Sequence, residues 1–157
     1  MTVQDNFDNT PDVCGLELTF RTCRDAHEFL LLNGLDLTNY VVFANDCMPN
    51  YKSAQVPIPG YIKGSLIVEM IEHKKLFEAL MLDIYPKNVA RSQINTYQEY
   101  KFSPCEMIVL MYDMVNIEVY AKKKVWLLQL LNNANALGAA KIVLKTEEND
   151  ERTGMYV

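Results

Sequence analysis

The chain has 157 residues, of which half are hydrophobic and 22% are charged. This composition is typical of one folded domain with its own core and excludes a disordered chain. Acidic residues outnumber basic ones by 20 to 15. The resulting net charge of −5 argues against nucleic-acid binding, which usually takes a cluster of basic contacts to phosphates.

Neither export nor membrane insertion is expected. The first residues lack both the basic and the apolar part of a signal peptide. The strongest apolar run, residues 107–115, is interrupted by Asp113 and is shorter than the ~20 residues that span a bilayer. A cytoplasmic protein is therefore predicted, and its four cysteines, which show no metal-binding or redox spacing, should be reduced.

A strand and a capped helix open the predicted fold. Residues 1–13 are polar and are expected to form a flexible arm. Apolar and polar residues alternate over 15–20, which predicts a strand with one buried face. Thr22 is a suitable N-cap for a helix that ends near Gly34, because glycine takes the left-handed conformation without strain. A short β-branched and aromatic run over 40–44 predicts the next strand.

The middle of the chain holds a proline-rich segment. Residues 45–63 contain three prolines and should form the longest loop, a place where function often resides. A helix is predicted over 65–73. Residues 76–85 are dense in apolar side chains and stop at Pro86, which favours a strand buried on both faces, although a helix stays open as an alternative.

A short helix and a hairpin come next. Thr96 opens a sequence that resembles a capping box and predicts one short helical turn. Two runs, 106–112 and 115–121, are separated by a turn sequence and predict a β-hairpin. Tyr120 alternates with the apolar residues of the second run and is expected on the outer face.

The last elements complete the prediction of an α+β fold. Residues 123–137 show the clearest helical period, and 142–145 predict a final strand. The element order predicts a single mixed β-sheet of about five to six strands with two to three helices packed on it. The hairpin argues against a purely parallel sheet. The expected organisation is one domain over 14–157 behind the arm.

No catalytic, cofactor or metal motif is visible. A phosphate-binding glycine loop, a dinucleotide fingerprint and a nucleophile elbow are all missing from the sequence. The two histidines, His27 and His73, are too few to suggest a zinc site. Cys105 opens a buried strand, and Cys47 has no evident base, so both are interpreted as structural. No catalytic residue, cofactor or metal is therefore predicted, and the question of enzymatic activity stays open with the balance against it.

Tyrosines and one charged segment are the candidate contact sites. Nine tyrosines are many for this length, and Tyr51 and Tyr61 fall in the proline-rich loop. Tyrosine is enriched at binding surfaces, although it is also an ordinary strand residue. The segment 146–153 adds further candidates, which are Glu148, Asp150, Glu151 and Arg152. The simpler interpretation of that segment is a solvated turn.

Several sequence pieces resemble a family of small uncharacterised proteins from Bacillus-type bacteria. The resemblance covers about residues 64–157, and the N-terminal third only loosely. It implies a bacterial origin and transfers no catalytic residue. The pieces are Ile94-Asn-Thr-Tyr-Gln-Glu-Tyr, Ser103-Pro-Cys-Glu-Met, Asp113, Ile117-Glu-Val-Tyr-Ala-Lys and Thr146-Glu-Glu-Asn-Asp-Glu-Arg-Thr.

The leading hypothesis is a small acidic protein-interaction module, in an immunity-like or inhibitory role toward another protein. Its negative charge would steer association with a basic partner. The alternative is a small-molecule-binding domain or enzyme with a pocket near the 45–63 loop and the strand ends. A homodimer formed through an edge strand is a third possibility.

Overall fold

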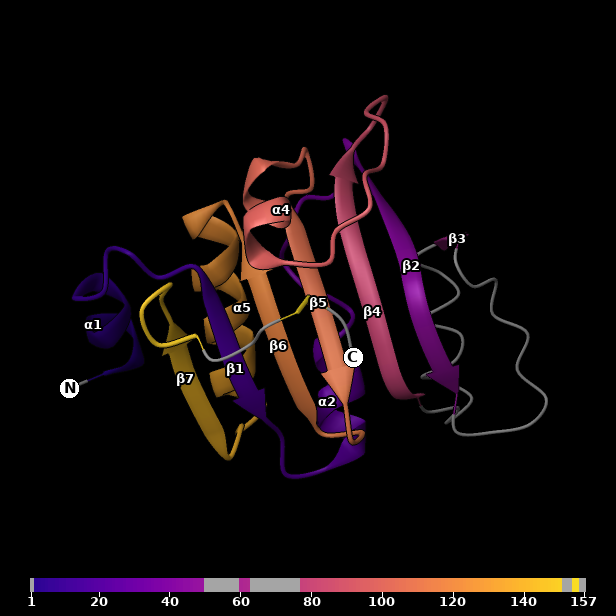
Figure 1. Ribbon diagram of the computed structural model, residues 1–157. Coiled ribbons are helices and arrows are strands. Elements are labelled where there is room, and N and C mark those ends of the chain that lie inside the picture. The colour runs from indigo at the N-terminus through magenta and orange to yellow at the C-terminus, as the bar shows by residue number, and fades with distance from the viewer. Residues whose placement is uncertain (1, 50–59, 63–76, 151–153, 156–157) are drawn as a thin grey trace.

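The computed structural model of the protein describes residues 2–49, 60–62, 77–150 and 154–155. Within these ranges seven strands form one sheet in the order β3-β2-β4-β5-β6-β1-β7 (Figure 1). The strands are β1 (Gly15–Thr19), β2 (Tyr40–Pro49), β3 (Gly60–Ile62), β4 (Phe77–Pro86), β5 (Met107–Tyr112), β6 (Asn116–Ala121) and β7 (Lys141–Lys145). The described helices are α1 (Val3–Asp8), α2 (Cys23–Phe29), α4 (Tyr97–Phe102) and α5 (Lys124–Ala136).

The predicted α+β class with a single sheet is confirmed. Each neighbouring pair of strands runs antiparallel, so the described sheet is antiparallel throughout. It has one strand more than the upper number expected, because residues 60–62, assigned to a loop, pair with β2. The same loop was expected to begin at residue 45, but β2 continues to Pro49 past a register shift between Ala44 and Asp46. The helix predicted over 65–73 lies outside the described residues.

Helices cover both faces of the sheet (Figure 1). On the first face, α2 and α5 pack against alternate strand residues such as Leu16, Val109 and Val119. On the second face, a smaller core includes Ile108, Leu110 and Tyr120 from the strands and Tyr100 from α4. Tyr120 was expected on an outer face, but it is fully buried because α4 and the segments beside it cover that face.

The N-terminal residues differ from the expected flexible arm. Residues 3–8 form α1, which begins at a capping box between Thr2 and Asp5. Val3 and Phe7 pack against the core of the first face, and Val13 is buried in it. Two apolar residues one turn apart are thus enough to dock this short helix.

The caps predicted for two further helices are confirmed, although α2 ends at Phe29 and does not reach Gly34. The Thr22 hydroxyl accepts a hydrogen bond from the Asp25 amide at 3.1 Å and begins α2. The Thr96 hydroxyl accepts one from the Glu99 amide at 3.1 Å and begins α4. This second cap matters for the site described below, because it sets where the side chains of α4 meet the sheet.

One histidine makes the stability of this fold dependent on pH. His27 is buried in α2, and its Nδ1 lies 2.6 Å from the carbonyl oxygen of Cys23. Burial lowers the pKa of His27 below its ordinary value of 6.5, against a smaller opposing effect of the Cys23 carbonyl. The imidazole therefore stays neutral in the folded protein under conditions in which the unfolded chain already binds a proton.

The free energy of unfolding should fall as the pH drops from about 6.5 toward the lower folded-state pKa of His27. Urea unfolding of the wild type and of His27→Gln at about pH 8 and about pH 5.5 measures this loss. We expect the wild type to lose more stability between the two pH values than the variant. Equal losses would show that His27 does not contribute.

Candidate functional site

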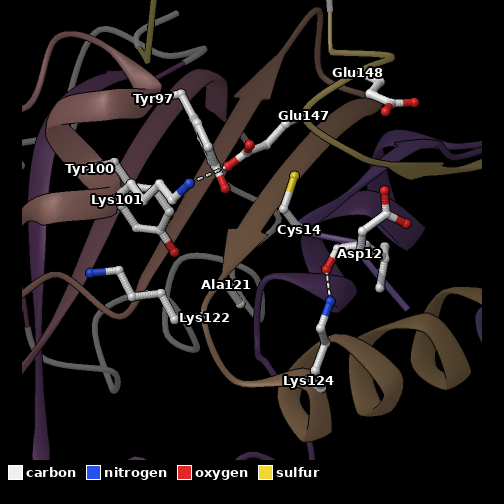
Figure 2. A pocket seen from close by; sticks show the side chains of 11 residues that line it. Asp12, Cys14, Tyr97, Tyr100, Lys101, Ala121, Lys122, Lys124, Glu147 and Glu148 are labelled. Atoms are coloured by element: carbon white, nitrogen blue, oxygen red, sulfur yellow. Dashed lines mark hydrogen bonds and ion pairs between the residues drawn. The ribbon is translucent and has the colours of Figure 1, made fainter. Parts of the chain in front are cut away.

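A pocket of about 480 Å³ opens at the end of the sheet where β1 begins and β6 ends (Figure 2). Four segments distant in sequence meet there: the residues before β1, the helix α4, the junction between β6 and α5, and the turn that follows β7. The lining residues are Asp12, Val13, Cys14, Tyr97, Tyr100, Lys101, Ala121, Lys122, Lys124, Glu147 and Glu148. The volume is in the range of ~300–1,000 Å³ typical of small-molecule sites.

Two uncharged polar groups stand at the centre of the pocket. The Cys14 thiol comes from the residues before β1, and the Tyr97 hydroxyl comes from α4. The Tyr97 ring packs against the rings of Tyr100 and Tyr120, with 5.8 Å between centroids in each case. These ring contacts hold the hydroxyl in place.

Burial keeps these central groups protonated. It raises the pKa of the Cys14 thiol, and the nearby carboxylates of Asp150 and Glu147 raise it further, against a smaller opposing effect of the Tyr97 hydroxyl. The pKa of Tyr97 is raised as well, again mainly by burial. A protonated thiol is a poor nucleophile, so the centre of the pocket is suited to hydrogen bonding rather than to covalent chemistry.

Charged side chains form the walls of the pocket. Lys101 and Glu147 form an ion pair at 2.9 Å across the gap between α4 and the turn after β7 (Figure 2). Lys122 donates to the carbonyl oxygen of Ser103, and its ammonium nitrogen lies 5.1 Å from the centroid of the Tyr100 ring. Lys124 donates to the carbonyl oxygen of Val13. Asp12 and Glu148 complete the wall with two carboxylates.

A buried charge cluster anchors the turn that carries Glu147 and Glu148. The Lys145 ammonium lies 2.9 Å from Glu118 and 3.1 Å from Asp150, and these three side chains are only 5–7% exposed. The Tyr120 hydroxyl donates to Asp150 at 3.0 Å. Buried charges are tolerated only when they are paired, so Lys145 holds Asp150, and with it the end of the turn, against the sheet.

The turn also closes on itself. The Thr146 amide donates to the side-chain oxygen of Asn149 at 2.8 Å, and the Asn149 amide donates back to the Thr146 hydroxyl at 3.3 Å. The Asn149 side-chain amide donates to the carbonyl oxygen of Leu144 at 3.1 Å. The pocket wall is thus a compact turn with one buried end.

Gly15 gives this arrangement the space it needs. A Cβ atom at Gly15 would lie 2.5 Å from the carbonyl oxygen of Val119 and 3.1 Å from the Tyr120 ring. Gly15 pairs with Tyr120 on one side and with Lys145 on the other. The missing side chain therefore leaves room for the Tyr120 ring to lie across β1, close to Asp150.

The structure separates the candidate contact residues predicted from the sequence. Glu148 lines the pocket. The Asp150 carboxylate is buried against Lys145. Tyr61 lies in the short strand β3, and Tyr51, Glu151 and Arg152 lie outside the described residues. The pocket is at the β1–β7 edge, whereas the alternative hypothesis placed one near the 45–63 loop at the other edge.

Most of the pocket was not predicted. Cys14, Lys122 and Lys124 were not among the candidate site residues. The capping box at Thr96 was the one useful signal, since it places Tyr97 and Lys101 on a single helical turn. No short sequence pattern predicts that this helical turn lies beside β1.

The described ranges hold neither a metal-binding cluster nor a membrane-spanning helix. They contain no group of three or more His, Cys, Asp or Glu side chains that could hold a metal ion. No helix in the same ranges is long and apolar enough to cross a membrane.

The chain matches one protein family over residues 15–156, described as "Protein of unknown function (DUF2691)". The chain belongs to this family, and the resemblance to uncharacterised Bacillus-type proteins is confirmed. It is 27% identical over 97 residues to "Uncharacterized protein YncE" of Bacillus subtilis (strain 168). That match spans 61% of this chain and 63% of the Bacillus protein. No solved structure matches the chain.

Replacing Lys145 should be far more costly than replacing Lys141 on the same strand. Lys145→Met leaves Glu118 and Asp150 buried without their shared cation, and we expect a loss of ~3–5 kcal/mol in the free energy of unfolding. Lys141 is 54% exposed in its pair with Glu17, so Lys141→Met should cost less than ~1 kcal/mol. Urea unfolding measures both variants, and equal losses would contradict the structural role of Lys145.

Proposed function

We propose that this member of the DUF2691 family is a binding domain for a small polar ligand, held in the pocket between β1, α4 and the turn after β7. The observation that supports this proposal most strongly is the pocket itself. It has a volume of about 480 Å³, with hydrogen-bonding groups at its centre and charged side chains on its walls. Sites for small ligands typically combine this size with a few convergent polar groups.

The chemistry of the pocket favours binding over catalysis. The raised pKa of Cys14 keeps the thiol protonated, and the lysine ammonium groups already donate to carbonyl or carboxylate oxygens. Each of these groups is suited to orienting a ligand rather than to attacking one. A cytoplasmic location is part of the proposal, because Cys14, Cys23 and Cys105 are free thiols, as is usual for proteins of reducing compartments.

A protein-interaction module, in an immunity-like or inhibitory role, is the second candidate. It is favoured by Phe102, whose side chain is 83% exposed at the end of α4. Phe102 is flanked in sequence by Lys101, which lines the pocket, and by Ser103, whose carbonyl holds Lys122. Large exposed aromatic residues are frequent anchors of protein interfaces. The net charge of −5 would assist association with a basic partner.

The ligand-binding proposal is tested by combining a thermal-shift screen with labelling of cysteines. A library of small polar metabolites is screened for compounds that raise the Tm, and each hit is then tested for protection of Cys14 from a thiol reagent. Labelling is best done near pH ~8.5, because the raised pKa of Cys14 slows its reaction at neutral pH.

Cys23, half-buried at the start of α2, is the internal control, and mass spectrometry reports both sites. We expect hits that slow the labelling of Cys14 and leave Cys23 unchanged. A screen without hits, or hits that protect neither or both cysteines equally, would contradict binding in this pocket.

The second candidate is tested with Phe102→Asp. The exposed side chain contributes little to folding, so the Tm should change by no more than a few degrees. If Phe102 anchors a protein partner, affinity capture with the wild type should retain one dominant protein that the variant loses. The same set of captured proteins for both would exclude Phe102 as a contact.

A further inference from the structure

The ion pair of Lys101 and Glu147 lies between the pocket and solvent. Both residues line the pocket, and their side chains are 48% and 49% exposed. Cys14 and Tyr100 line the same pocket but are half-buried and buried, respectively. The pair is therefore nearer to solvent than the centre of the pocket is, and Figure 2 shows it stretched from α4 toward the turn after β7.

The two walls that this pair connects are each anchored to the sheet. On the α4 side, Tyr100 is buried, and its hydroxyl donates to the carbonyl oxygen of Glu106 at 3.2 Å. On the other side, the buried contact of Asp150 with Lys145 holds the end of the turn. Lysine and glutamate side chains are long and rotate about several bonds. The pair can therefore separate by rotation of its two side chains alone, while both walls stay in place.

We propose that the Lys101–Glu147 pair is a gate, which restricts the entry of solutes to the centre of the pocket while it is formed and admits them when its side chains separate. An exposed ion pair contributes little free energy, so the formed and separated arrangements interconvert readily. Salt screens exposed charges and should favour the separated arrangement. The inference goes beyond the proposed function, because the gate acts on solutes in general and needs no bound ligand.

The gate is tested by the rate at which N-ethylmaleimide, an uncharged reagent, labels Cys14 at low salt and near pH ~8.5. Lys101→Met removes the ion pair, and we expect labelling to become roughly twofold to fivefold faster, in keeping with the small free energy of an exposed pair. Lys101 is changed rather than Glu147 because the Glu147 carboxylate raises the pKa of Cys14. Its loss would speed the reaction without any change in access.

Three controls separate access from other effects. Lys101→Arg keeps a cation opposite Glu147 and should label at the rate of the wild type. Lys141→Met removes another exposed ion pair, with Glu17 at 3.2 Å, that does not line the pocket, and it should leave the rate unchanged. Cys105 is fully buried and reports on opening of the whole fold, so its labelling should not change in any variant.

Salt provides a second measurement of the same gate. The ratio of the Lys101→Met rate to the wild-type rate should fall toward one as NaCl rises from about 0.05 M to about 1 M. An unchanged rate at Cys14 in Lys101→Met, a ratio that does not respond to salt, or equal acceleration in Lys141→Met or at Cys105 would overturn the gate. The assay contains no ligand, so its failure is distinct from a failure of the proposed function, which the ligand screen decides.

Discussion

The pocket depends on one buried interaction, the contact of the Lys145 ammonium with the carboxylates of Glu118 and Asp150. A cation between two carboxylates is stable inside a protein only when the geometry is good and further hydrogen bonds are present, and Tyr120 supplies one to Asp150. Glu118 belongs to a central strand, whereas Asp150 belongs to the turn after an edge strand. The cluster therefore ties a surface turn to the middle of the sheet, and the wall of the pocket is built on that turn.

The same cluster explains why the sheet is covered on both faces. The apolar side chains of β6 face α5, and a sheet covered on one face only would leave Glu118 and Tyr120 in water. Here α4 packs on that second face, and Tyr97 and Tyr100 extend a row of rings toward Tyr120. The pocket lies at the end of this row, where Cys14 meets Tyr97. Its central groups are thus held by aromatic packing, and its walls are held by charges.

The sequence predicted the elements well and the pocket poorly, for physical reasons. Local signals set the helix caps at Thr22 and Thr96, the alternation in β1 and the hairpin of β5 and β6, and the structure confirms each of them. The alternation in β6 was interpreted as a strand with one solvent-exposed face. No short sequence pattern shows that Asp150 contacts Tyr120 on that face. Contacts across such sequence separations depend on the order of strands in the sheet, which short patterns do not specify.

Hydrogen exchange in an Asp150→Asn variant tests the anchoring role of this cluster most directly. The amides of Thr146 and Asn149 report on the turn through their bonds to each other's side chains, and the Val109 amide in β5 reports on the core. We predict that exchange at the two turn amides accelerates well beyond any change at Val109, because the turn opens locally when its buried end loses the ion pair. Equal changes at all three amides would contradict the view that the buried charges hold the pocket wall.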